Sequence, residues 1–132
     1  MGNREAAARL HKSGFNCAQS VLCACGKYTG LDDDTALAIS AGFGGGVRCG
    51  EICGAISGAV MAIGIAYPFA DASDAKAKER IAALTRECTG RFENEFGCVR
   101  CCELKANGCS CTALIEYAAA LAEDIIKENE NK

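Results

Sequence analysis

The chain has 132 residues, of which 50% are hydrophobic and 23% charged, and its formal net charge is −3 at pH 7. This is the size of one domain with enough apolar material for a core, so we expect residues 1–132 to form a single domain. No basic stripe, signal peptide or bilayer-length apolar segment is found, which argues against nucleic acid and membranes and predicts a soluble, cytoplasmic protein.

The residue pattern favours helices throughout. In chain order, the expected helices cover residues 1–12, 16–28, 32–42, 51–66, about 73–96 and 112–128. Asn16 suits the N-cap of the second helix, Gly30 closes the turn after it, and Asp71 or Ser73 caps the fifth. Residues 97–110 are expected to form a cysteine-rich loop with at most one helical turn. No segment alternates like a strand, so we predict an all-α, single-domain bundle of about five to six helices with short loops.

Eleven of the 132 residues are cysteines, which is close to the density of a disulfide scaffold in a secreted protein. We do not expect structural disulfides, because no export signal is seen and the cytosol keeps thiols reduced. The odd number also excludes complete pairing within the chain. Metal ligation, redox cycling and simple burial remain as explanations.

Three cysteines fall at expected helix starts and on inward faces of those helices. Cys17 shares a face with Val21, and Cys53 lies in the first turn of its helix. Cys111 continues the apolar stripe of the last helix toward its start. Free N–H groups and partial positive charge at a helix N-terminus stabilise a thiolate. These three sulfurs are therefore candidates for a site that holds negative charge.

The late loop adds a C-x-x-C-C group at residues 98–102, in which Cys101 is a further candidate. This spacing is compatible with zinc, with a cluster or with a redox pair. The possible additional ligands are Cys49, Cys98, Cys102 and Cys109.

Other cysteines have a simpler explanation, because free cysteine often fills a protein core. Cys23, Cys25 and Cys88 are interpreted in this way. His11 is the only histidine and is expected to be solvated, so we find neither a Cys-His pair for catalysis nor a two-histidine zinc pattern. No C-x-x-C-H occurs, and covalent haem is not expected.

Gly50, Gly54 and Gly58 recur every four residues and would form a smooth strip on the fourth expected helix. Glycine inside a helix costs about 1 kcal/mol relative to alanine, so something is expected to approach this strip closely. The candidates are another helix, including one from a second subunit, and a cofactor. The nearby loop of residues 44–46 could offer N–H donors to sulfur or to an anion, or could be only a tight turn.

Several segments together resemble one family. They are F-N-C-A-Q-S-V-L at 15–22, G-F-G-G-G at 42–46, G-E-I-C-G-A-I-S-G-A at 50–59, F-x-x-x-F-G-x-x-x-C-x-E-L at 92–104 and C-x-x-L-I-x-x-A-A from 111. The chain resembles the small redox-active proteins named for their C-GCAxxG-C-C cysteine pattern, over roughly residues 10–128. The resemblance implies that the signature cysteines are Cys17, Cys53, Cys101 and Cys111. A similar domain occurs in split-Soret cytochromes, where iron–sulfur and haem centres are associated with it, which implies an iron–sulfur site and favours a homodimer.

The leading hypothesis is therefore an iron–sulfur protein that carries or senses electrons, with an electron-transfer partner that the sequence does not identify. The first alternative is a metal-free thiol–disulfide protein in which Cys53 pairs with Cys101 or Cys111. A thiolate module for zinc or another soft metal is the second alternative. A purely structural bundle with buried cysteines is the third. Whether the chain is an enzyme is left open by these patterns.

Overall fold

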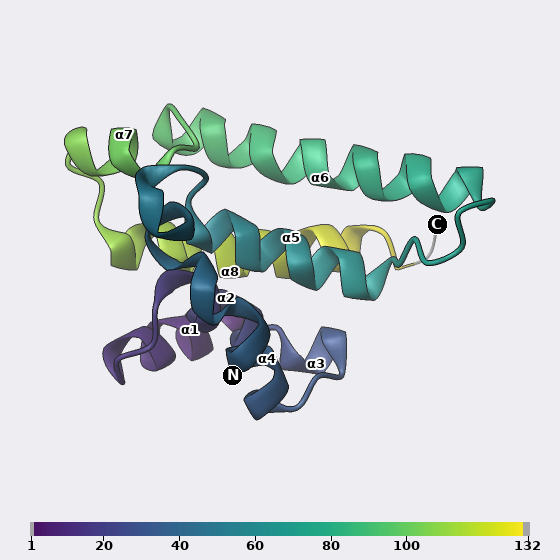
Figure 1. The fold of residues 1–132 in the computed structure, drawn as a ribbon, viewed down its shortest axis with the longest axis horizontal. Coiled ribbons are helices and arrows are strands. Elements are labelled where there is room, and N and C mark those ends of the chain that lie inside the picture. Colours follow the sequence, from purple (N-terminus) through teal and green to yellow (C-terminus); the bar gives the residue numbers. More distant parts are fainter. Residues whose placement is uncertain (1, 131–132) are drawn as a thin grey trace.

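The computed structural model describes residues 2–130, and these residues form eight α-helices joined by short turns (Figure 1). The helices are α1 Asn3–Lys12, α2 Cys17–Ala24, α3 Gly26–Thr29, α4 Asp33–Ser40, α5 Gly54–Ala66, α6 Ala75–Phe96, α7 Cys101–Ala106 and α8 Cys111–Glu128. A 3-10 turn, η1 Ala41–Phe43, and a second turn, η2 Gly46–Gly50, connect α4 to α5. The prediction of an all-α bundle is confirmed, and no strand occurs within residues 2–130. Met1, where the first helix was expected to begin, lies outside the described residues.

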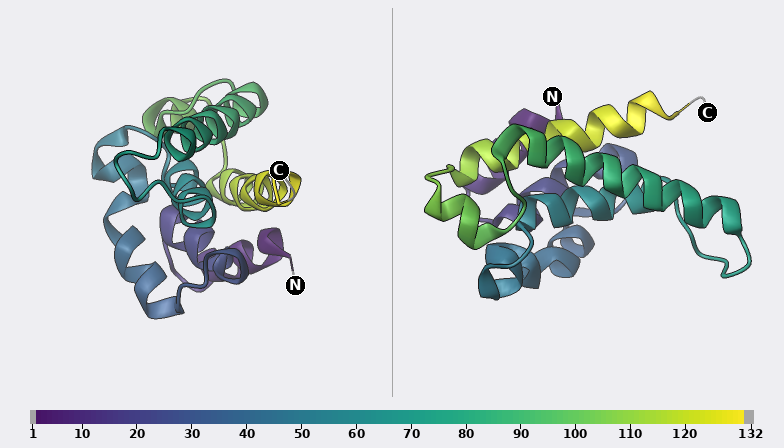
Figure 2. Two further views of the ribbon diagram at one scale, coloured as in Figure 1. Left: turned by 90° about the vertical axis from the view of Figure 1, so that its right-hand side faces the viewer. Right: turned by 90° about the horizontal axis from the view of Figure 1, so that it is seen from above.

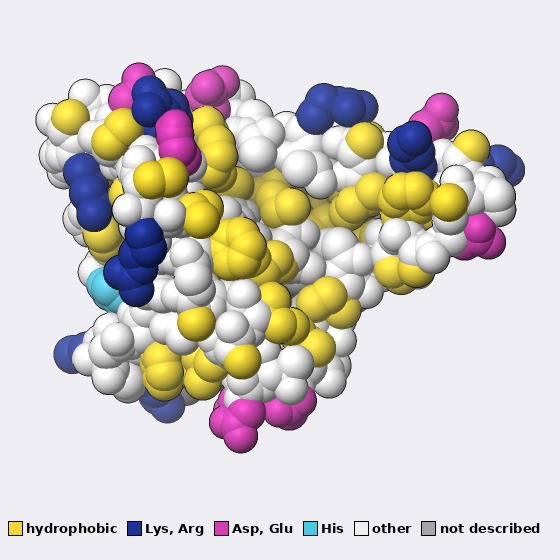
Figure 3. Space-filling model, in the orientation of Figure 1, with side chains coloured by type: hydrophobic (Ala, Val, Ile, Leu, Met, Phe, Trp, Pro, Cys, Tyr) yellow, Lys and Arg dark blue, Asp and Glu magenta, His cyan; other side chains and the backbone are white. Residues whose placement is uncertain are grey.

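The three longest helices, α5, α6 and α8, lie next to one another, and α1–α4 pack on one side of them (Figures 1 and 2). Helix α2 is central, because it contacts α1, α4, α5 and α8. Large side chains such as Leu22, Ile56, Phe92 and Ile115 are fully buried between these helices. Burial of each such side chain contributes about 1.5–3 kcal/mol. On the surface, apolar side chains gather along the seam between α5 and α6 (Figure 3).

None of the helices in the described part of the chain combines the length and the apolar character needed to cross a bilayer.

Three cysteines belong to this core, as the sequence predicted. Cys23, Cys25 and Cys88 are all buried. Burial raises the pKa of both Cys25 and Cys88 to about 12. These thiols remain protonated at neutral pH and are not nucleophilic, so they serve packing.

The second expected helix, residues 16–28, begins where the sequence predicted but is divided into two helices, α2 and α3. Asn16 caps α2 through a capping box, in which its side chain accepts from the Gln19 N–H while the Gln19 side chain accepts from the Asn16 N–H. Helical geometry breaks at Cys25, whose ψ is 11°, and α3 begins at the next residue, Gly26. Gly30, with φ of 73°, ends α3 as expected.

Two helix starts differ from the sequence prediction. Helix α5 begins at Gly54 and not at residue 51, because residues 51–53 are extended and pair with another segment. Asp74, not Asp71 or Ser73, caps α6 by accepting from the Ala77 N–H. Gly50 therefore lies outside α5, and the glycine strip is reduced to its other two members.

That strip packs against α2 of the same chain. A Cβ built on Gly58 would lie 2.8 Å from the Ala18 carbonyl oxygen and 3.1 Å from the Val21 Cβ, and one built on Gly54 would overlap the Cys17 sulfur. The two helices approach so closely because neither glycine carries a side chain. Of the two explanations offered for the strip, helix packing is the one that is observed.

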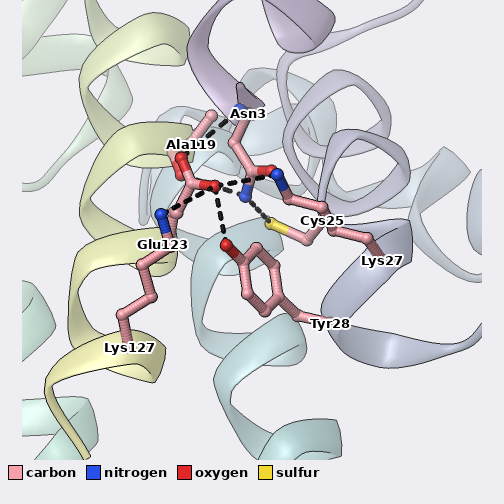
Figure 4. A network of polar contacts seen from close by, with 7 residues as sticks. All are labelled: Asn3, Cys25, Lys27, Tyr28, Ala119, Glu123 and Lys127. Carbon is pink, nitrogen blue, oxygen red and sulfur yellow. Dashed lines mark hydrogen bonds and ion pairs between the residues drawn. The ribbon is translucent and has the colours of Figure 1, made fainter. Parts of the chain in front are cut away.

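A polar network centred on Glu123 joins α8 to the N-terminal helices (Figure 4). Its carboxylate accepts from the Tyr28 hydroxyl at 2.7 Å and from the Asn3 N–H at 3.4 Å, and it pairs with Lys27 at 3.2 Å. The buried Asn3 amide also donates to the Cys25 sulfur at 3.3 Å. These contacts hold α1 and α3 against α8.

Candidate functional site

Four cysteines that are far apart in the sequence line one small pocket at one end of the bundle. The pocket is lined by Cys17, Gly45, Cys53, Cys101, Lys105, Cys111 and Leu114. Its volume is about 40 Å³. We call Cys17, Cys53, Cys101 and Cys111 the pocket cysteines. They are the four signature positions that the sequence analysis named.

Each pocket cysteine stands at the start of a helix. Cys17, Cys101 and Cys111 are the first residues of α2, α7 and α8, and Cys53 is the N-cap of α5. The helix-start prediction is confirmed for Cys17 and Cys111, whereas Cys53 was expected inside the first turn of its helix and lies immediately before the first residue of α5. The short helix α7 was expected to be mainly loop. The longer helices α2, α5 and α8 direct their free N–H groups and positive dipole ends toward this region.

An isolated antiparallel bridge positions two of the sulfurs. The Cys53 N–H donates to the Val99 carbonyl at 2.9 Å, and the Cys101 N–H donates to the Glu51 carbonyl at 2.6 Å. This short pairing of residues 51–53 with 99–101 fixes the start of α5 beside the start of α7. It also explains why α5 begins later than its sequence pattern indicated.

An ion pair lies over this bridge. Arg100 Nη2 is 3.1 Å from Glu51 Oε2, and both side chains are about half exposed. Exposed pairs contribute little to stability, at most about 1 kcal/mol, so the backbone hydrogen bonds are the stronger constraint.

Cys53 is the most enclosed pocket cysteine, with 4% of its surface exposed. Burial raises the pKa of Cys53 to about 11, and the neighbouring Cys17 and Cys101 contribute to this rise. Hydrogen bonds from the backbone N–H groups of Ala55 and Ile56 act in the opposite direction and lower it. In the free protein the Cys53 thiol is thus protonated at neutral pH. A metal or a strong electrophile would have to displace that proton.

Cys111 differs from its prediction in one respect. It was expected to point into the protein, yet it is exposed while lining the pocket. Its position at the first turn of α8, before the buried part of the stripe at Leu114, accounts for this. Cys111 therefore gives the pocket an opening to solvent.

The glycine-rich turn beside the pocket is left-handed. Gly45, Gly46, Val47 and Arg48 have φ values of 64°, 64°, 58° and 61° in succession. A Cβ on Gly46 would lie 2.9 Å from the Cβ of Cys101, so the turn packs tightly on α7. Positive φ is unfavourable for a β-branched residue such as Val47, so the turn stores backbone strain next to the pocket.

The four additional cysteines lie outside the pocket lining. Cys49 donates to the Gly46 carbonyl at 3.4 Å, and Cys102 lies against Gly50. Cys98 lies near Cys109 and accepts a long contact of 3.9 Å from Asn107. All eleven cysteines are free thiols.

The donor set of the pocket is suited to a soft metal centre. Four cysteines with no histidine or carboxylate are the ligand set of common iron–sulfur clusters. Within residues 2–130, no three Cys, His, Asp or Glu side chains are already grouped so that they could hold a metal ion. The sulfurs thus share a pocket without forming a preorganised ion site.

Sequence reasoning missed Lys105 and Leu114 as pocket residues, whereas Gly45 belongs to the loop of residues 44–46 that it had considered as a neighbour of sulfur. Lys105 could have been found, because it lies four residues after Cys101 and thus on the same face of α7. His11 lies away from the pocket, with its Nδ1 3.2 Å from the Phe15 carbonyl oxygen.

Comparison with known proteins gives a family but no individual relative. No curated protein and no solved structure matches the chain. A family model described as "Putative redox-active protein (C_GCAxxG_C_C)" matches residues 15–125, a span that includes all four pocket cysteines. The chain therefore belongs to the C_GCAxxG_C_C family of redox-active proteins.

Proposed function

We propose that the pocket is the redox centre of this chain and that the pocket cysteines hold an iron–sulfur cluster that carries or senses electrons. The observation that carries the proposal is the convergence of four thiols, from four separate helix starts, on one pocket. A purely structural role would not require four thiols to share one pocket. Of the other buried thiols, Cys25 accepts from the Asn3 amide and Cys23 donates to the Asp33 carboxylate, and neither lines the pocket.

The chain supplies the features that such a centre needs. When bound, the cluster would supply one-electron transfer. The helix starts at Cys17, Cys53 and Cys111 offer N–H groups that compensate the negative charge of thiolates. The buried Leu114 side chain limits water on one wall. Ligation by Cys53 would release the proton that its burial retains, so assembly is expected to be faster at higher pH.

Anaerobic purification followed by iron and acid-labile sulfide analysis tests the proposal. We expect a brown protein that contains both elements. Cys53→Ser should lose most of the iron, whereas Cys102→Ser, which changes an exposed cysteine outside the pocket, should retain it. Iron-free wild-type protein under these conditions would refute the cluster, and unchanged iron in Cys53→Ser would remove Cys53 from the ligand set.

A second candidate, thiol–disulfide exchange, is favoured by the bridge that holds Cys53 close to Cys101. In this reaction the two thiols lose two protons and two electrons and form one disulfide, while a partner disulfide gains them and becomes two thiols. The expected signature is a colourless protein whose free-thiol count falls by two on mild oxidation. Cys101→Ser should abolish that change, and Cys88→Ser should not.

A further inference from the structure

One charged side chain, Lys105, lines the pocket together with the four thiols. It lies on α7, four residues after Cys101, so both side chains share one face of the helix. Lys105 is exposed and also lines the pocket, so its long side chain can cover part of the wall while its ammonium group stays in water.

The charge of Lys105 is not neutralised locally. No carboxylate in the described part of the chain lies within ion-pair distance of its ammonium group. Glu103 on the same helix and Glu51, whose carbonyl oxygen accepts from the Cys101 N–H, both pair with Arg100, at 3.6 and 3.1 Å. The remaining pocket lining consists of thiols, Gly45 and Leu114, none of which is a carboxylate.

We propose that Lys105 is the electrostatic positioning residue of the pocket, which steers small anionic reactants toward the sulfur atoms. The proposal deepens the function proposed above, since it concerns the same pocket. A cation at the wall of the pocket raises the local concentration of anions that approach it. The four thiols provide the reactive atoms, and Lys105 makes the pocket selective for anionic over neutral reactants.

Competitive alkylation measures this selectivity directly. The reduced full-length chain, with a chelator present, is treated at one pH with anionic iodoacetate or neutral iodoacetamide, and modification of Cys111 is followed by peptide mass spectrometry. Both reagents react with the same thiolate, so the ratio of the two rates cancels the thiolate fraction. It reports only the local potential that the reagent encounters.

The variants are Lys105→Met, Lys105→Arg and Lys78→Met, the last being an exposed lysine on α6 that does not line this pocket. We expect Lys105→Met to lower the iodoacetate-to-iodoacetamide ratio at Cys111 by roughly three- to tenfold at low salt. The ratio should be retained in Lys105→Arg and in Lys78→Met, and the difference should vanish near 1 M salt, where the Debye length is about 3 Å. The ratio at Cys49, exposed and outside the pocket, should not change in any variant.

An unchanged ratio in Lys105→Met, or an equal fall in Lys78→Met, would overturn the proposal. Because the assay needs only free thiols, its result does not depend on whether the protein binds a cluster. Iron and sulfide analysis decides the latter question separately.

Discussion

The sulfur of Cys17 lies directly against the backbone of Gly54, so the first residue of α2 touches the first residue of α5. A side chain at position 54 would overlap this sulfur and would also come within 2.7 Å of the Phe43 carbonyl oxygen. The glycine that follows Cys53 is thus required by the geometry of the pocket itself.

Gly54→Ala should therefore disturb both the fold and the pocket. We expect a loss of about 1–3 kcal/mol in the free energy of unfolding, because neither Cys17 nor the Phe43 backbone can move freely. Bound iron should fall as well. Gly64→Ala on the same helix is the matched control, since a Cβ there meets nothing within 4 Å, and it should stabilise by about 0.5–1 kcal/mol. Urea unfolding of both variants measures the difference, and equal effects would contradict this interpretation of the contact.

In the strained turn of residues 45–48, a substitution is expected to stabilise the protein and not to destabilise it. Val47 has φ of 58° and about half of its surface is exposed, so its side chain gains little from packing. Val47→Gly should raise the free energy of unfolding by up to about 1 kcal/mol, because glycine adopts positive φ without steric cost. Val47→Ala keeps a Cβ and should gain less. A clear loss of stability in Val47→Gly would show that the turn is not strained.

Buried thiols should make the protein sensitive to alkali. Burial raises the pKa of Cys25 and Cys88 from 9.0 to about 12, so the unfolded chain loses these protons first as the pH rises. Their stabilising effect is complete below about pH 9 and is lost progressively toward pH 12, with a slope of up to about 1.4 kcal/mol per pH unit for each group. Urea unfolding between pH 8 and 11 measures the slope. Cys88→Ala should reduce it, and an unchanged slope in that variant would exclude Cys88 as a contributor.

Glu123 is expected to stabilise the packing of the C-terminal helix α8 against the N-terminal helices α1 and α3. Hydrogen bonds from Tyr28 and Lys27 hold its pKa below the ordinary value against the opposing effect of burial. Its contribution is therefore present at neutral pH and is lost as the pH falls toward and below that lowered pKa. We expect Glu123→Ala to cost about 1–3 kcal/mol, because it leaves the Tyr28 hydroxyl without its acceptor.

Glu116→Ala is the matched control, since Glu116 makes only a 3.7 Å ion pair with an exposed arginine on α1. It should change the free energy of unfolding by less than about 0.5 kcal/mol. If the two variants are equally stable, the network around Glu123 is not a structural connection.

Helical periodicity was sufficient to predict most of the helices from the sequence, because α1, α6 and α8 have strong apolar faces and clear ends. It failed where a long-range contact overrides local preference. Residues 51–53 have a helical pattern but pair with 99–101, and neither partner carries a strand signal. The late start of α5 follows from that pairing alone.

The candidate site was recognised through its cysteines, and their convergence follows from their shared position at helix starts. What could not be predicted is which further residues approach them. Gly45 reaches the pocket through a run of left-handed residues that includes Val47, a residue type that normally argues against such a turn. The resemblance to the family distinguished Cys101 from its neighbour Cys102, and only Cys101 of the two lines the pocket.

The four helix starts come from positions spread between the second helix and the last, so the pocket exists only when the entire bundle has closed. Anything that binds there favours the closed form over the unfolded chain, by about 2.7 kcal/mol at a hundredfold excess over its Kd. Occupancy of the pocket should then be readable as a shift in the melting temperature of the entire protein. Without the ligand that fills the pocket, the chain would unfold more often in the cell and would be degraded faster.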